Sequence, residues 1–126
     1  MEEFITLIKD TIKNNVTLTN GLIIGKIGTG ESNSMQIAPS NTETTFLNKS
    51  IIYKLDLLFL SKSKDQKTCI NELDAIGKYL RRLKKYPGTD NICWSNAIQT
   101  SGPRYVDQED GGYWIYSMVI SNEIVM

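Results

Sequence analysis

The chain has 126 residues, of which 40% are hydrophobic and 22% charged, which is usual for one soluble globular domain spanning residues 1–126. Its 14 basic and 14 acidic residues give a formal net charge of zero. This balance disfavours specific nucleic-acid binding, which depends on neutralising phosphates, and it suits self-association because copies of the chain repel one another little.

The N-terminal segment predicts a short amphipathic helix over residues 3–14. Its apolar residues recur on one side at helical spacing: Phe4, Ile5, Ile8 and Ile12. The first residues are acidic rather than basic, and no apolar run in the sequence reaches the length needed to cross a membrane. We therefore expect a protein that stays in the cytoplasm where it is made and has no membrane partner.

The segment after this helix predicts weak strands separated by loops. Residues 22–27 are mostly apolar and follow a turn signal at Asn20-Gly21, so a strand is expected there. Residues 28–45 are rich in Gly, Ser, Asn and Thr, with one apolar island at residues 35–38. The island predicts a short strand, and the rest of the 28–45 region predicts mobile loops.

The centre of the sequence predicts a long strand over residues 50–62. Alternate positions are apolar and point to one face: Ile51, Tyr53, Leu55, Leu57 and Phe59. The opposite face carries a mixed set, namely Ile52, Lys54, Asp56, Leu58, Leu60 and Lys62. A face of this composition suits a partly solvated or interface side of a sheet.

A second amphipathic helix is predicted over residues 65–86. Its apolar stripe consists of Ile70, Leu73, Ile76, Leu80 and Leu83. Ser63 and Asp65 are both suitable N-caps, and Gln66 follows Ser63 at the spacing of a capping box. Four cations lie near the helix end, where they complement the helix dipole: Arg81, Arg82, Lys84 and Lys85. Pro87-Gly88 is expected to end the helix, and its apolar stripe is expected to pack on the long strand.

The C-terminal third predicts strands over residues 92–100 and 113–125. Between them lie a turn at Gly102-Pro103 and an acidic, glycine-tipped turn over residues 107–112. The last strand is expected to point Trp114, Tyr116, Met118, Ile120 and Ile124 to one face, and Ile115 and Val119 to the other. The order of elements predicts an α+β domain, with a mostly antiparallel sheet of four to five strands and two helices on one face.

Residues that carry chemistry are scarce. The chain has no histidine, which excludes Cys-His and Ser-His-Asp nucleophile systems and most zinc sites. Cys69 and Cys93 form no CxxC motif, so we expect two small buried or half-buried thiols. Gly25, Gly28 and Gly30 lack the order and the Lys-Ser/Thr pair of a phosphate-binding loop, so they predict a flexible strand end. No enzymatic activity, cofactor or metal ion is expected.

Two groups of carboxylates are candidates for a functional role. Three acids precede Gly111 in the predicted hairpin turn: Asp107, Glu109 and Asp110. They lack the flanking helices and the final glutamate of an EF-hand, so a solvated hairpin tip is expected. Glu72 and Asp74 lie on the second helix and Asp56 on the long strand, but nothing in the sequence brings a desolvated pair together. Solvated surface positions are expected for these three.

The residues expected at an oligomer or partner interface fall into three groups. They are Lys54, Asp56 and Leu58 on the mixed strand face, Asp107, Glu109, Asp110, Tyr113 and Trp114 at the acidic hairpin, and Arg81 and Arg82 at the helix end. Aromatic residues are enriched in interface cores, although Trp94 and Trp114 fit a position in the domain core equally well. The helix dipole alone explains the two arginines as a solvated helix end.

The second half of the chain resembles a known family of phage proteins. The motifs that carry the resemblance are Glu72-Leu73-Asp74-Ala75-Ile76 in the second helix, Trp94 and Ile98, Gly102-Pro103, and Gly112-Tyr113-Trp114-Ile115-Tyr116-Ser117 after an acidic turn. In these motifs and in the order of its elements, the sequence is similar to the tail terminator and minor capsid proteins of long-tailed phages and prophages. Residues 28–45 depart most from that pattern.

The resemblance implies a non-enzymatic virion component without a cofactor. Family members are helix-covered sheets that assemble into rings, typically hexameric, which cap the tail tube and meet the head-completion proteins. The expected partners are therefore copies of the chain itself, a tail tube protein and a head-completion protein. A head–tail connector or head-closure protein is the nearest alternative, and would show a charged loop in its lumen. A small host ligand-binding module is a different class, and would show a pocket lined by convergent polar groups.

Overall fold

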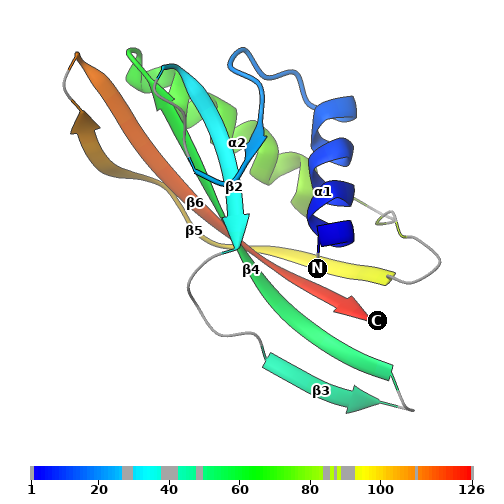
Figure 1. Cartoon of the computed structure of the whole chain (residues 1–126). Helices are drawn as coiled ribbons and strands as arrows, with labels where there is room; N and C mark the ends of the chain where they lie inside the picture. The colour runs from blue at the N-terminus through cyan, green and yellow to red at the C-terminus, as the bar shows by residue number, and fades with distance from the viewer. Residues whose placement is uncertain are drawn as a thin grey trace.

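The computed structural model describes residues 2–26, 30–37, 43–47, 50–83, 86, 88, 93–109 and 111–125. Within these residues two helices and six strands make up an α+β fold, which confirms the predicted class (Figure 1). In chain order the elements are α1 (Glu2–Asn15), β1 (Ile23–Ile24), β2 (Ser32–Ile37), β3 (Glu43–Leu47), β4 (Ser50–Ser63), α2 (Gln66–Arg81), β5 (Cys93–Glu109) and β6 (Tyr113–Val125).

The strands form one sheet in the order β1-β2-β4-β6-β5, and β3 pairs with β4 beside this path. Only β1 and β2 pair in parallel, and the other described pairs are antiparallel. One edge of β4 pairs with β6 from Ile52 to Ser63, while its other edge pairs with β3 near its start and with β2 near its end. β3 and the start of β4 extend past the two helices (Figure 1).

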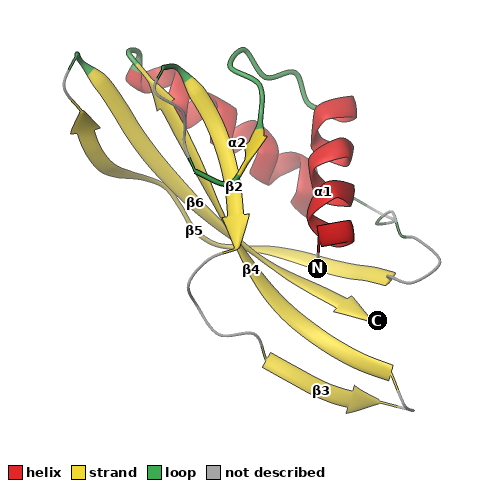
Figure 2. Cartoon of the chain, in the orientation of Figure 1, coloured by secondary structure: helices red, strands yellow, loops and turns green. Residues whose placement is uncertain are grey.

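Both helices pack against the same face of the sheet (Figure 2). The strand residues buried on that face are Leu55, Leu57 and Phe59 on β4, and Tyr116, Met118, Ile120 and Ile124 on β6. The helices contribute Phe4, Ile8 and Ile12 from α1, and Cys69, Leu73, Ile76 and Leu80 from α2. Burial of one such aliphatic or aromatic side chain contributes about 1.5–3 kcal/mol, so this shared core accounts for much of the drive to fold. The predicted inward positions of both long strands are confirmed for these residues.

The start of α2 differs from the predicted capping box. Asp65 is the N-cap, and its side chain accepts a hydrogen bond from the backbone N–H of Lys67 at 3.1 Å. The Ser63 hydroxyl instead accepts from the backbone N–H of Asp65 at 3.1 Å. Gln66 donates its side-chain amide to the Tyr116 hydroxyl, which ties the first turn of α2 to the sheet. The pairing of Ser63 with Gln66 is therefore wrong, although both residues take part in fixing the helix start.

Helix α2 also ends earlier than predicted. Arg82 is the C-cap, and its backbone N–H donates to the carbonyls of Lys78 and Tyr79. Of the four cations expected near the helix end, only Arg81 lies within the last turn, where it joins Lys78. Lys84, Lys85 and Pro87 lie outside the described residues.

The N-terminal strands are the part of the fold that the sequence predicted least well. Strand β1 has only two residues, because Gly25 adopts a φ of +102° and turns the chain directly after Ile24. Strand β2 starts at Ser32, three residues before the predicted start, and includes polar residues that are buried. The end of the predicted loop region overlaps β3, which pairs with the start of β4. Residues 28, 29 and 38–42 of that region lie outside the described residues.

Strand β5 continues through the predicted turn at Gly102-Pro103, whose peptide bond is cis. Its register with β6 shifts at four places, so the extra residues are accommodated as bulges while the strand stays paired. Gly102 has a φ of +89°, and a Cβ there would lie 2.3 Å from the Ser117 carbonyl oxygen and 2.7 Å from the Met118 Cα. The close approach of β5 to β6 therefore requires glycine. The chain reverses at Gly111 and Gly112, so Asp107 belongs to the strand and not to the turn.

Candidate interaction surface

The candidate interaction surface lies on the face of the sheet that points away from both helices. We call it the open face, because no described helix covers it. The strand register assigns to it Lys54, Asp56, Leu58, Leu60 and Lys62 on β4, Ile115, Ser117, Val119, Ser121 and Glu123 on β6, Ser32, Ser34 and Gln36 on β2, and Asn96, Ile98, Ser101, Arg104 and Asp107 on β5. The mixed face predicted for the long strand is therefore the outer face of the sheet.

The open face has an apolar centre and polar margins. Leu58 lies directly opposite Val119 in the register, and both side chains are half-buried. Ile98 on the neighbouring strand is 55% exposed. Charged residues flank this centre at one end, where exposed Lys54 lies opposite Glu123. An apolar centre inside a polar rim is the usual arrangement of a protein–protein interface.

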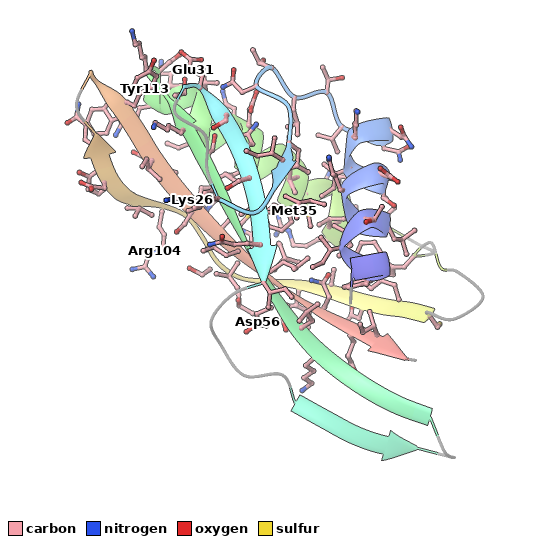
Figure 3. All side chains as sticks on the ribbon, in the orientation of Figure 1. Lys26, Glu31, Met35, Asp56, Arg104 and Tyr113 are labelled. Carbon is pink, nitrogen blue, oxygen red and sulfur yellow. The ribbon has the colours of Figure 1, made fainter. Side chains whose placement is uncertain are left out.

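Two labelled charges of the open face are separated in Figure 3. Asp56 lies near the middle of β4 and is half-buried, whereas Arg104 projects from β5 away from the sheet. A shallow hollow of about 150 Å³ lies beside Ile98 and Asn96, and Lys54 and Glu123 also line it. This volume is below the 300–1,000 Å³ typical of small-molecule pockets, so it suits a single side chain of a protein partner.

At the far end of the open face, near the turn between β5 and β6, side chains are buried. Lys62 and Ile115 are both buried there, and the ammonium of Lys62 lies 5.1 Å from the centre of the Tyr113 ring. The ammonium of Lys64 lies 5.3 Å from the same ring. Tyr113 is therefore engaged in cation–π contacts with two lysines of its own chain, which are worth about 0.5–1 kcal/mol each at partly exposed sites. This half-buried tyrosine is less available to a partner than the sequence predicted.

The other predicted residues of the acidic hairpin divide between the two faces of the sheet. The register places Asp107 opposite Ile115 and Glu109 opposite Tyr113, on the side of the open face. Trp114 points to the helix side, where its ring meets the exposed Tyr105 ring edge-on at 5.9 Å and its carbonyl accepts from the Cys69 thiol. Asp107 is exposed and accepts a hydrogen bond from the backbone N–H of Gln108. Glu109 is the last residue of β5, and Asp110 lies outside the described residues.

Arg81 and Arg82 lie in the helical layer and therefore apart from the open face. Both are exposed, and the Arg81 guanidinium donates to the carbonyl of Gly77 at 3.2 Å. The structure thus places Lys54, Asp56 and Leu58 of the predicted interface together on the open face, with Asp107 and Tyr113 at the far end of that face, and does not bring the arginines to them.

The tryptophan and cysteine predictions have mixed outcomes. Trp94 is a core residue, since it is buried between Phe4 and Tyr86 at ring distances of 5.5 and 4.8 Å. Cys69 is buried as predicted, and burial raises the pKa of its thiol. Cys93 is exposed at the first residue of β5, so its predicted burial is wrong.

A buried carboxylate was missed by the sequence reasoning. Glu72 is only 6% exposed, which contradicts the expected surface position. Its Oε1 accepts from the backbone N–H groups of Thr19, at 2.6 Å, and Asn20, at 3.3 Å, and its Oε2 accepts from the Asn33 side-chain amide. Asn33 also donates to the carbonyl of Gly21 at 2.8 Å. We call this group the Glu72 clasp, because it joins α2, β2 and the loop that precedes β1.

The position of Glu72 in the sequence did contain a signal. It falls on the same helical side as Cys69, Leu73 and Ile76, which are all buried. A carboxylate on a buried stripe must find donors, because an unpaired charge is costly to desolvate. The partners come from distant segments, so their identity was not predictable from spacing. Asp74, by contrast, is surface-exposed and pairs with Lys78 at 3.0 Å, as expected for its side of the helix.

Comparison of the sequence with models of protein families and with curated proteins gives no match in either case. Among the residues that the structure describes, no group of three or more acidic or cysteine side chains is arranged to hold a metal ion. None of the described helices is long and apolar enough to span a membrane.

Proposed function

We propose that this protein is a non-enzymatic assembly protein that associates through the open face, and that it serves as the tail terminator of a long-tailed phage or prophage. The observation that carries the proposal is the apolar centre of the open face, with Leu58, Val119 and Ile98 inside a charged margin. The fold adds support, because a sheet with helices on one face is what the family resemblance implies.

Ring assembly needs two different contact surfaces on each copy, because a heterologous interface joins unlike patches. The open face is one candidate. The ribbon formed by β3 and the start of β4 is a second, since it extends past the helices and can reach a neighbouring copy (Figure 1). In the proposed assembly the ribbon of one copy lies against the open face of the next, and the ring caps the tail tube and meets the head-completion proteins in the virion neck.

The free edge of β5 is a poor alternative for this contact. Pairing with a partner strand requires a regular row of backbone donors and acceptors, and four register shifts interrupt β5. The longest regular stretch, from Asn96 to Gln99, is four residues. This irregularity favours docking through the face of the sheet over strand addition at its β5 edge.

The test compares two isoleucine-to-glutamate variants by light scattering coupled to size exclusion. Ile98→Glu places a charge in the open face, and Ile70→Glu makes the same change on α2, where the isoleucine is also exposed, at 38%. The wild type and Ile70→Glu are expected to form rings or to join tube ends when mixed with the candidate tail tube protein, and Ile98→Glu is expected to remain a monomer. Assembly takes place in the bacterial cytoplasm on this proposal.

Three results would contradict it. A wild-type chain that ignores the tube protein would remove the tail-terminator role. Equal assembly by Ile98→Glu and Ile70→Glu would remove the open face from the interface. Assembly only with a portal or other head component, and not with the tube, would favour the connector alternative.

A further inference from the structure

A second feature of the molecule, separate from the open face, is a hollow between the end of α1 and the loop that precedes β1. Its volume is about 380 Å³, which lies within the 300–1,000 Å³ range of ligand pockets. The walls are mainly apolar and consist of Val16, Leu18, Leu22 and Ile23. Ile23 is 40% exposed, so apolar surface at the hollow is open to solvent.

The Glu72 clasp holds the wall of this hollow in place. The Glu72 carboxylate accepts hydrogen bonds from the backbone of Thr19 and Asn20, and the Asn33 side chain donates one to the carbonyl of Gly21. These hydrogen bonds tie the loop to α2 and β2. The bond between Glu72 and Asn33 joins residues that are 39 positions apart in the sequence. A hollow supported in this way is formed before a ligand arrives, which lowers the entropy cost of binding.

Two polar residues are among those that line this mainly apolar hollow. Lys13 lines the hollow from α1 and provides a positive charge. Asn20 also lines it, and its side-chain Nδ2 is buried without a hydrogen-bond partner in the described part of the chain. A buried donor without an acceptor costs about 1–3 kcal/mol, so a ligand that supplies an acceptor recovers that cost. The Glu72 carboxylate does not meet this need, because its described contacts are with the backbone of Asn20.

We propose that this hollow binds a short apolar group that ends in a carboxylate. The hydrocarbon part lies against Val16, Leu18 and Leu22, and the carboxylate accepts from Asn20 Nδ2 and pairs with Lys13. Glu72 is itself negatively charged and contacts the backbone of Asn20, so it would repel the carboxylate of a ligand. Three N–H donors already satisfy the Glu72 oxygens, and Lys13 balances the charge of the ligand. The ligand is either a free short-chain carboxylic acid or the C-terminal carboxylate of a protein chain ending in Leu, Ile or Val.

The experiment is an NMR titration of the intact, ¹⁵N-labelled protein with 4-methylpentanoate. Amide shifts are expected to change at residues 13–23 and to saturate. The neutral isostere 4-methylpentanamide is expected to bind at least fivefold more weakly. Lys13→Gln should weaken carboxylate binding about two- to fivefold, the size expected for one partly exposed ion pair. Asn20→Ala should weaken it about tenfold, as expected when a hydrogen bond to a charged acceptor is lost.

Two controls keep these results interpretable. Lys9→Gln removes the same charge one turn earlier on α1, outside the hollow, and should leave binding unchanged. Leu18→Trp fills the hollow and should abolish binding while the circular dichroism spectrum stays native. Peptides ending in Leu with a free or an amidated C-terminus then identify the source: tighter binding by the free-acid peptide than by 4-methylpentanoate indicates a protein terminus, and the reverse indicates a small acid.

The proposal is wrong if the amide shifts at residues 13–23 do not move at millimolar carboxylate. Equal binding of the carboxylate and the neutral amide would also overturn it, since Lys13 and Asn20 would then have no role as carboxylate ligands. Equal losses from Lys9→Gln and Lys13→Gln would show a general charge effect and not a site. None of these outcomes depends on assembly with a tail tube, so this proposal and the proposed function can fail separately.

Discussion

Replacement of Glu72 by glutamine tests whether the buried clasp stabilises the fold. The substitution keeps the size and shape of the side chain and removes its charge. One oxygen remains to accept from the backbone N–H groups of Thr19 and Asn20, which the carboxylate now accepts at 2.6 and 3.3 Å. The new NH₂ group, however, faces the side-chain amide of Asn33, so a donor meets a donor at a buried position.

The expected loss follows from these contacts. A hydrogen bond to a charged group contributes about 1.5–3 kcal/mol, and a buried donor left unsatisfied costs about 1–3 kcal/mol. Because the Asn33 contact is lost and the two backbone contacts are weakened, we expect the free energy of unfolding to fall by about 2–4 kcal/mol. That is a large share of the roughly 5–15 kcal/mol that stabilises a typical domain. Urea unfolding followed by circular dichroism measures it, with the m-value as a check that the transition stays two-state.

The matched control is Asp74→Asn, two residues away on the same helix. Asp74 pairs with Lys78 at 3.0 Å, but the two side chains are 40% and 53% exposed, so this change should cost less than about 0.5 kcal/mol. Equal effects of Glu72→Gln and Asp74→Asn would refute the reasoning, since the clasp would then contribute no more than a surface ion pair.

The remaining predictions concern Gly102 and the two cysteines. Gly102→Ala should lower the free energy of unfolding by at least about 3 kcal/mol, because the new Cβ would lie 2.3 Å from the Ser117 carbonyl oxygen at a φ of +89°; urea unfolding measures the loss, and a change below 1 kcal/mol would mean that β5 shifts freely. An excess of thiol reagent should modify exposed Cys93 rapidly and buried Cys69 only on unfolding, so one thiol per chain should react under native conditions and two in urea. Burial raises the pKa of the Cys69 thiol above its ordinary value of 9.0, so its stabilising effect is complete below that pH and is lost as the pH rises further. The Cys69→Ser variant should lose less stability between pH 8.5 and 10 than the wild type, and an identical pH profile would contradict this.

The regular elements were predictable because their residues repeat with a clear period. Alternation in β4 and β6 identified the inward positions Leu57, Phe59, Met118 and Ile120, which are all buried. The helices followed from apolar spacing in the same way, although Ile70, predicted to lie in the apolar stripe of α2, is 38% exposed and that position is wrong. β3 was missed because its sequence, rich in threonine, carries no alternation of its own and its pairing depends on β4. The conformation of β3 therefore depends on its pairing with β4, which the local composition does not indicate.

Polar residues were harder to place than apolar ones. Asn33 and Ser34 are buried in β2, although their types favour loops, because the ladder with β4 fixes them on the two faces of the sheet. Gly102-Pro103 has the composition of a turn, yet bulges let β5 continue through it. Among the candidate interface residues, alternation placed Lys54, Asp56 and Leu58 together correctly, whereas no periodicity related the acidic hairpin to the arginines of α2.

Strand β2 connects the two proposed sites and also separates them. Asn33 joins the Glu72 clasp on the helix side, and the adjacent positions Ser34 and Gln36 belong to the open face. Six register pairs with β4 hold β2 in place, so a substitution on one face should not move residues on the other. It follows that Ile98→Glu should block assembly and leave carboxylate binding intact, while Leu18→Trp should do the reverse. If instead each variant disturbed both sites with the fold preserved, β2 would have to shift as a unit, and the open face and the hollow would be coupled through it.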